Sequence, residues 1–211
     1  MSLPAAAAPP LVLGFALGLR HALDPDHLVA MSTLVSRERN PLRSAVLGGT
    51  WGLGHCLALF TVGLVVVLAH VPVPEPIGHA MEVGIGFMLI GLGATSLLLG
   101  AKRRAAISRT AHDVRHRFSR RPFLVGIVHG LAGSGALALL VLATIPSPVA
   151  GLLYIAIFGF GAVGGMMGMS LLLSLPFALA SARAGSLEKH LVRFAAVFSV
   201  LFGLYYVYQV A

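Results

Sequence analysis

Charged residues are scarce in this chain of 211 residues. Asp, Glu, Lys and Arg make up 10% of it, whereas a soluble globular domain carries about 25%. Hydrophobic residues make up 57%, and the mean hydropathy is +0.91. This combination argues against a water-soluble protein and predicts a polytopic membrane protein.

Several other features are scarce or missing. Cys56 is the single cysteine, which excludes an intrachain disulfide and disfavours zinc–cysteine or thiol-relay chemistry. No Lys or Arg precedes Arg20, so the first apolar run lacks the basic segment of a signal peptide, and we expect it to be a retained helix. The alternating segments of a transmembrane β-barrel and the phosphate-binding loop of an ATPase are not found either.

What the sequence does contain is six apolar segments, each with the roughly 20 residues that a helix needs to cross a bilayer. The segments are 10–35, 44–69, 78–100, 122–145, 149–177 and 191–210. Helices satisfy the backbone hydrogen bonds inside lipid. The predicted fold class is therefore an all-α polytopic membrane protein with six transmembrane helices, and residues 1–211 form a single domain.

Basic residues gather in the loops that follow the first, third and fifth segments. These residues are Arg37, Arg39, Arg43, Lys102, Arg103, Arg104, Arg109, Arg115, Arg117, Arg120, Arg121, Arg183, Lys189 and Arg193. The positive-inside rule places these loops in the cytoplasm and both termini outside it. The formal charge of +8 is thus a topology signal, and we expect no nucleic-acid partner.

A weak internal repeat divides the chain into halves 10–101 and 122–211, joined by the basic loop 102–121. The matches are GFALGL at 14–19 with GIVHGL at 126–131, WGLG at 51–54 with FGFG at 158–161, and LIGL at 89–92 with LFGL at 201–204. Because each half has three spans, the second half would be inverted in the membrane. Inverted repeats are typical of transporters whose site lies near the midplane.

The first apolar segment contains a polar cluster at its centre, RHALDPDH, residues 20–27. Asp24 and Asp26 are two of only seven acidic residues in the chain. One charge at this depth costs roughly 2.5–3.5 kcal/mol on insertion scales, so the cluster indicates a function. His21, Asp24 and His27 follow one another at intervals of three residues and lean to one side of a helix.

Pro25 should kink or break this helix, because it lacks an amide hydrogen and clashes with the carbonyl of His21. Two further histidines are expected at similar depth. His55 lies about 16 Å into the second span at 1.5 Å per residue, and His129 lies in the fourth span. The predicted metal ligands are His21, Asp24, Asp26, His27 and His55, with His129 as an additional candidate.

Two carboxylates and neutral imidazoles would balance the charge of a divalent cation. Mixed nitrogen and oxygen donors suit nickel, cobalt, zinc or iron better than calcium or magnesium. Three other interpretations stay open: a structural cluster in which Arg20 pairs with Asp24, a proton or sodium relay, and a membrane acyltransferase that uses the His21-x4-Asp26 pattern with His as general base.

The cluster RHALDPDH, followed by LGHC at 53–56, resembles the signature of the nickel/cobalt transporter family. The segment RPFLVGIVHGLAGSGALALLVLAT, 121–144, is similar to the shorter urease-accessory (UreH-like) branch of nickel permeases. In this resemblance His21, Asp26 and His27 match signature positions, Asp24 matches its usual acidic residue, and His55 matches the second histidine motif. Pro25 and the count of six spans depart from the larger permeases.

The resemblance implies uptake of Ni²⁺ or Co²⁺ across the bacterial cytoplasmic membrane, with the ion as substrate and no prosthetic group. An exporter and a proton-coupled carrier of another cation remain alternatives. A homo-oligomer and a cytoplasmic metallochaperone are compatible partners besides the metal ion and the lipid bilayer.

Overall fold

The structure is a computed structural model that describes residues 8–69, 74–106, 120–131, 145, 147–183 and 185–210. Every secondary-structure element within these residues is a helix. The helices are α1 (Ala8–His21), α2 (Pro25–Val35), α3 (Pro41–Ala69), α4 (Glu75–Ala106), α5 (Arg120–Leu131), α7 (Pro148–Arg183) and α8 (Gly185–Val210). The expectation of an all-α protein is confirmed for the described part of the chain.

Four of the described helices are long and apolar enough to cross a membrane. The qualifying stretches are Pro41–Val65 in α3, Glu75–Leu98 in α4, Val149–Ala182 in α7 and Ser186–Val210 in α8. They correspond to the second, third, fifth and sixth predicted spans. Large apolar side chains such as Phe160 and Phe194 are 75% and 70% exposed on their outer faces, as a lipid-facing surface requires.

The first and fourth predicted spans have a different form. Segment 10–35 is divided into α1 and α2 between His21 and Pro25, so the predicted break is confirmed. Of segment 122–145, the structure describes α5 and Ile145, and residues 132–144 lie outside the described residues. With 11 and 12 residues, α2 and α5 are each about 16–18 Å long, roughly half of the hydrocarbon thickness.

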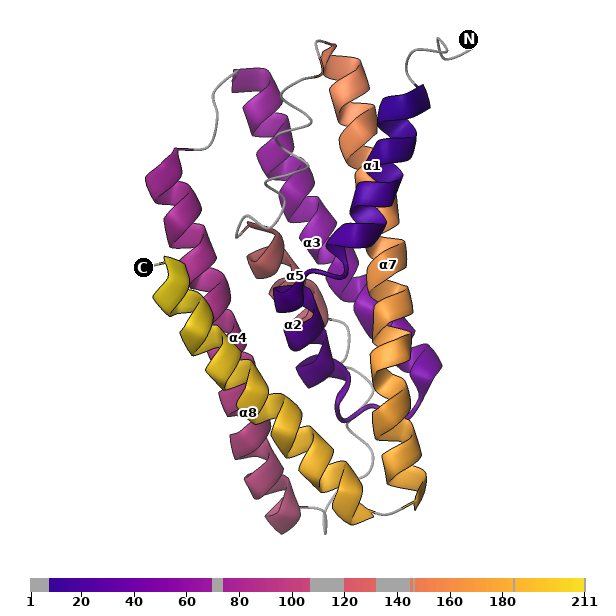
Figure 1. Cartoon of the computed structure of the whole chain (residues 1–211), viewed down its shortest axis with the longest axis vertical. Coiled ribbons are helices and arrows are strands. Elements are labelled where there is room, and N and C mark those ends of the chain that lie inside the picture. Colours follow the sequence, from indigo (N-terminus) through magenta and orange to yellow (C-terminus); the bar gives the residue numbers. More distant parts are fainter. Residues whose placement is uncertain are drawn as a thin grey trace.

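The two short helices lie in the middle of the bundle, surrounded by the long ones (Figure 1). Helix α3 packs against α5 and α7, α1 packs against α7, and α4 packs against α8. Buried apolar side chains, among them Met31, Trp51, Leu89 and Phe158, form one core between these helices. His21 at the end of α1, Asp26 and His27 at the start of α2 and His129 near the end of α5 are accordingly buried within the bundle.

Two basic residues of the connection after α2 contact helices α4 and α8. The side chain of Arg37 donates a hydrogen bond to the carbonyl oxygen of Ser96 in α4. Arg39 forms an ion pair with Glu188 at the start of α8, with an N–O distance of 3.2 Å. The connection after α2, the last part of α4 and the α7–α8 turn accordingly lie toward the same end (Figure 1).

Candidate metal centre

The helix break at Pro25 creates the centre of the site. Asp24 has extended backbone angles, φ −60° and ψ 141°, and occupies the N-cap position of α2, with Pro25 in the first turn. Its carboxylate makes no capping hydrogen bond. The Oδ2 atom of Asp24 instead lies 2.7 Å from Nδ1 of His21 at the end of α1, so the carboxylate is directed at an imidazole across the break.

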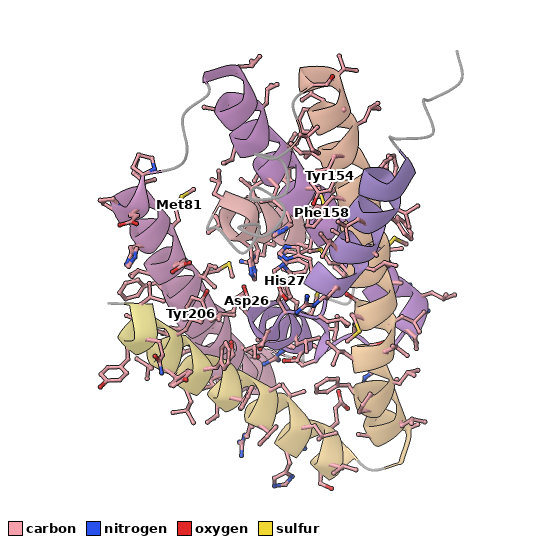
Figure 2. The ribbon with its side chains drawn as sticks, turned by 45° about the horizontal axis from the view of Figure 1, so that its top comes forward. Asp26, His27, Met81, Tyr154, Phe158 and Tyr206 are labelled. Atoms are coloured by element: carbon pink, nitrogen blue, oxygen red, sulfur yellow. The ribbon has the colours of Figure 1, made fainter. Side chains whose placement is uncertain are left out.

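Asp26, in the first turn of α2, contacts two other imidazoles. Its Oδ1 atom lies 3.1 Å from Nδ1 of His27, and its Oδ2 atom lies 2.9 Å from Nε2 of His129 in α5. A carboxylate is only an acceptor, so each of these ring nitrogens carries the hydrogen. Asp26 thus connects two helices whose residues are about a hundred positions apart, and Figure 2 shows Asp26 and His27 at the centre of the bundle.

Helix α3 contributes His55 to the same cluster. The Nε2 atoms of His21 and His55 lie 2.9 Å apart. Helix α5 approaches α3 closely enough to add His129 because Gly126 and Gly130 lack side chains. A Cβ atom on Gly126 would collide with the carbonyl oxygen of Trp51, and one on Gly130 would collide with that of His55.

Three imidazole rings surround that of His27. Ring centroids lie 4.3 Å from His27 for His129, 4.5 Å for His21 and 5.0 Å for His55. Aromatic side chains pack against these imidazole rings. Trp51 lies 5.1 Å from His27 and 5.2 Å from His129.

These imidazoles are buried, and part of their hydrogen-bonding capacity is unused. His27, His55 and His129 are at most 1% exposed. Among the described residues, His27 Nε2, His55 Nδ1 and His129 Nδ1 have no hydrogen-bond partner. A buried polar atom without a partner costs roughly 1–3 kcal/mol, so a purely structural cluster would gain stability by replacing these rings with apolar side chains.

Two groups of three donors lie close enough together to hold a metal ion. One consists of His21, His27 and His55, and the other of Asp26, His27 and His129. Within each group one donor atom per residue lies within 4.8 Å of the others. Imidazole nitrogen with at most one carboxylate matches the donor set of nickel, cobalt, copper or zinc and not that of calcium or magnesium.

All six candidate residues predicted from the sequence lie in this cluster. His129, expected only from its depth, is as buried as His55. Asp24 is the exception in burial, because 38% of its side chain is exposed. The interpretation in which Arg20 neutralises Asp24 is wrong, since Asp24 pairs with His21 and Arg20 is exposed.

Sequence reasoning missed the aromatic cover of the site. Trp51 is fully buried and contacts three of the imidazoles. Phe158 in α7 lies 5.4 Å from His21. A signal for Trp51 was available, because the residue precedes His55 by one helical turn in WGLGH and therefore lies on the same face of the helix.

This geometry can be compared with known proteins. Residues 10–124 match the family model NicO, described as "High-affinity nickel-transport protein". The chain belongs to the NicO family. Because the family model is described as a nickel-transport protein and not as an enzyme, the acyltransferase interpretation is rejected.

Three relatives show how far the similarity extends. Urease accessory protein UreH of Bacillus sp. (strain TB-90) is 34% identical over 208 residues, which cover 94% of this chain and 90% of that protein. The high-affinity nickel transport protein of Cupriavidus necator is 31% identical over 91 residues, 43% of this chain and 25% of its own length. Chloroplast protein FOR GROWTH AND FERTILITY 2 of Arabidopsis thaliana is 28% identical over 163 residues, 71% of this chain and 43% of its own. No solved structure matches.

In this NicO-family chain a cavity of about 480 Å³ leads to the cluster. Asp24, Pro25 and Asp26 line one side, and α8 contributes the other side with Phe202, Tyr205, Tyr206 and Gln209. Tyr206 lies on the side of α8 that faces the bundle (Figure 2). The cavity therefore borders Asp26, whose carboxylate contacts His27 and His129.

Proposed function

We propose that this protein carries a divalent transition-metal ion, Ni²⁺ in the first place and Co²⁺ as a second substrate, into the cell through the buried His/Asp cluster. The ion is the cargo and not a resident cofactor. The proposed ligands are His21, Asp26, His27, His55 and His129, while Asp24 orients His21. Membership in a nickel-transport family supports the substrate class.

The observation that carries the proposal is the set of unpartnered ring nitrogens around His27. These nitrogens belong to buried imidazoles on three separate segments, the start of α2, the middle of α3 and α5. A relay for protons or sodium would not need them, because Na⁺ prefers oxygen ligands and a proton relay uses hydrogen-bonded donors and acceptors. Ligation requires neutral imidazole and ionised carboxylate, so binding of the ion displaces protons.

The helix crossings support the proposed inverted repeat. In the first crossing, between α1 and α7, a Cβ on Gly18 would collide with the carbonyl oxygen of Phe158. A Cβ on Gly161 would collide with that of Phe15.

The crossing between α5 and α3 has the same pattern. A Cβ on Gly126 would collide with the carbonyl oxygen of Trp51, and one on Gly54 would collide with that of Phe123. Gly126 in the α5–α3 crossing is thus equivalent to Gly18 in the α1–α7 crossing, and Gly54 is equivalent to Gly161.

These contacts favour a repeat in which GLRHA at 18–22 corresponds to GIVHG at 126–130. His21 is then the counterpart of His129, at a separation of 108 residues. The sequence analysis had instead matched GIVHGL at 126–131 with GFALGL at 14–19, a separation of 112 residues. The two alignments differ by four residues, about one helical turn. In the proposed architecture His21 at the end of α1 and His129 near the end of α5 occupy equivalent positions in the two halves, and rocking of the halves would open the site to either side.

The proposal includes uptake as the direction of transport and a defined orientation of the bundle in the membrane. Since the basic connection after α2 lies toward the end of the bundle where α4 ends and α8 begins (Figure 1), the positive-inside rule places that end in the cytoplasm. The membrane is then the bacterial cytoplasmic membrane, with both termini on the outer side.

The test is the metal content of cells that express the protein at matched membrane levels, measured by mass spectrometry after exposure to trace nickel, cobalt, zinc and manganese. Wild type should accumulate nickel or cobalt over empty-vector cells. His27→Ala should abolish the gain, and His79→Ala, which changes an exposed histidine outside the cluster, should retain it.

Two results would contradict the proposal. Nickel below the empty-vector level would mean export through the same site. An unchanged content of every metal in wild type, at verified membrane insertion, would remove the support for a metal carrier.

A further inference from the structure

We propose that the cluster holds the ion at two overlapping positions that share His27, and that transport passes the ion from one to the other. One position is formed by the nitrogens of His21, His27 and His55. The other is a mixed position formed by Asp26, His27 and His129. This inference rests on the proposed function and specifies how the site operates.

The three-nitrogen position is prepared by two carboxylates that are not its ligands. Asp24 accepts the Nδ1 hydrogen of His21, and Asp26 accepts that of His27. A carboxylate on one ring nitrogen of a histidine fixes the tautomer and directs the other nitrogen to a metal. Nε2 of His21 and Nε2 of His27 are thereby left as lone-pair donors, and the latter has no partner among the described residues.

His55 completes this position through a change of tautomer. Because Nε2 of His21 is an acceptor, its 2.9 Å contact with His55 requires a hydrogen on Nε2 of His55 in the ion-free protein. When an ion binds, this hydrogen must move to Nδ1 of His55, which is buried and has no partner among the described residues. The number of protons on the ring is unchanged.

The mixed position uses the same residue His27 from its other side. Asp26 lies between His27 and His129, at 3.1 and 2.9 Å from one nitrogen of each. An ion bound here replaces these hydrogen bonds with bonds to the carboxylate and to the same two ring nitrogens. The hydrogens on Nδ1 of His27 and Nε2 of His129 then move to Nε2 of His27 and Nδ1 of His129, which have no partner among the described residues.

Among the described residues, the five donors fall into two groups of three, and no group of close donors contains all five. Metal–nitrogen bonds of about 2.0–2.1 Å place two ligand atoms at most about 4.2 Å apart. Within the described chain, His21 and His129 belong to different groups of close donors, and only His27 occurs in both.

The cavity gives the two positions an order. Of the five donors in the two groups, only Asp26 lines the cavity against α8. An ion that arrives through the cavity meets the mixed position first, and the three-nitrogen position lies behind it. Exchange of one or two ligands at a time around His27 keeps the ion bound while it moves, as conduction through several weaker sites requires.

The experiment uses the purified full-length protein in lipid nanodiscs with Co²⁺ as the probe. Stoichiometry is measured by calorimetry, and the ligand set by the visible absorption of Co²⁺. His129→Ala and His21→Ala should each still bind one Co²⁺ per chain, with spectra that differ from one another, while cellular nickel uptake is lost in both. His27→Ala should abolish binding, and His79→Ala should behave as wild type.

A second variant tests the three-nitrogen position without removing a ligand. Asp24→Asn should alter the Co²⁺ spectrum of His129→Ala, in which only that position remains, and should leave the spectrum of His21→Ala unchanged. Size-exclusion profiles and thermal melts establish that each variant is folded before it is scored.

The outcomes separate this inference from the proposed function. If wild type binds Co²⁺ and either folded single variant loses all binding, or both give the same spectrum, the site is one composite position and the inference is overturned while metal transport stands. If folded wild type binds neither Co²⁺ nor Ni²⁺, the proposed function fails and the inference fails with it.

Discussion

The Oδ2 atom of Asp26 lies 2.9 Å from Nε2 of His129, although the residues are separated by 103 positions. This contact joins the first turn of α2 to the last turn of α5, the two short helices at the centre of the bundle. Because the same carboxylate also contacts His27, Asp26 determines the orientation of two imidazoles at once.

Replacement of Asp26 by Asn should therefore abolish nickel accumulation while the protein still folds. The amide retains the shape of the side chain but supplies one acceptor oxygen instead of two and no negative charge. Loss of a hydrogen bond to a charged group costs about 1.5–3 kcal/mol, which a folded bundle can tolerate. Cellular nickel content and the thermal melt of the purified protein would check both parts. Wild-type accumulation by Asp26→Asn would show that the carboxylate is dispensable.

The close approach of α5 to α3 predicts a position-specific effect of glycine replacement. Gly126→Ala should lower thermal stability, by about 1–3 kcal/mol in the free energy of unfolding, because the new methyl group would collide with the backbone at Trp51. Nickel binding should weaken as well, since His129 is displaced with the helix.

Gly164→Ala in α7 is the matched control, because a Cβ there meets no atom within 4 Å. Alanine is the better helix former by about 1 kcal/mol, so this change should be neutral or slightly stabilising. Equal melting temperatures for the two variants would contradict the proposed packing.

Trp51 is the single tryptophan of the chain and should report on the site directly. Its ring lies 5.1 Å from that of His27 and 5.2 Å from that of His129. At this distance a bound Ni²⁺ should quench its fluorescence in a saturable manner. The titration is done with wild type and with His27→Ala, and saturable quenching that persists in the variant would place the ion elsewhere.

The cavity beside α8 predicts a site of chemical blockage. In a Cys56→Ala background, Gln209→Cys should react with a membrane-impermeant thiol reagent added to the outside of the cell, and nickel uptake should fall as labelling proceeds. Gln209 lines the cavity. Tyr208→Cys is the control, because Tyr208 is 82% exposed and is not among the cavity-lining residues. Labelling of Gln209→Cys without loss of uptake would show that the ion takes another route.

Much of this site could be predicted because its signals are local. Pro25 lacks the amide hydrogen that an unbroken helix needs, so the break between α1 and α2 followed from the sequence. The cost of charge in lipid singled out Asp24 and Asp26 as candidate ligands, and the structure places both beside imidazoles. Helix rise placed His55 at the depth of this cluster.

The rest depends on how distant segments pack. Depth alone could not show that Gly126 and Gly130 bring His129 into the cluster, because the contact is made with the backbone of another helix. Asp24 could not be assigned to His21 rather than to Arg20, since both partners lie within one helical turn of it. Hydropathy does not register that a segment is broken in the middle, so the division of the first span into α1 and α2 had to be inferred from Pro25 alone.

The central claim is that the cluster around His27 binds the ion that crosses the membrane. Its most direct test is nickel flux into proteoliposomes that contain purified protein, measured as the nickel retained inside after removal of external metal. We predict a flux for wild type and for His79→Ala that is absent from His27→Ala at equal reconstitution. The same flux in wild type and in His27→Ala would contradict the account.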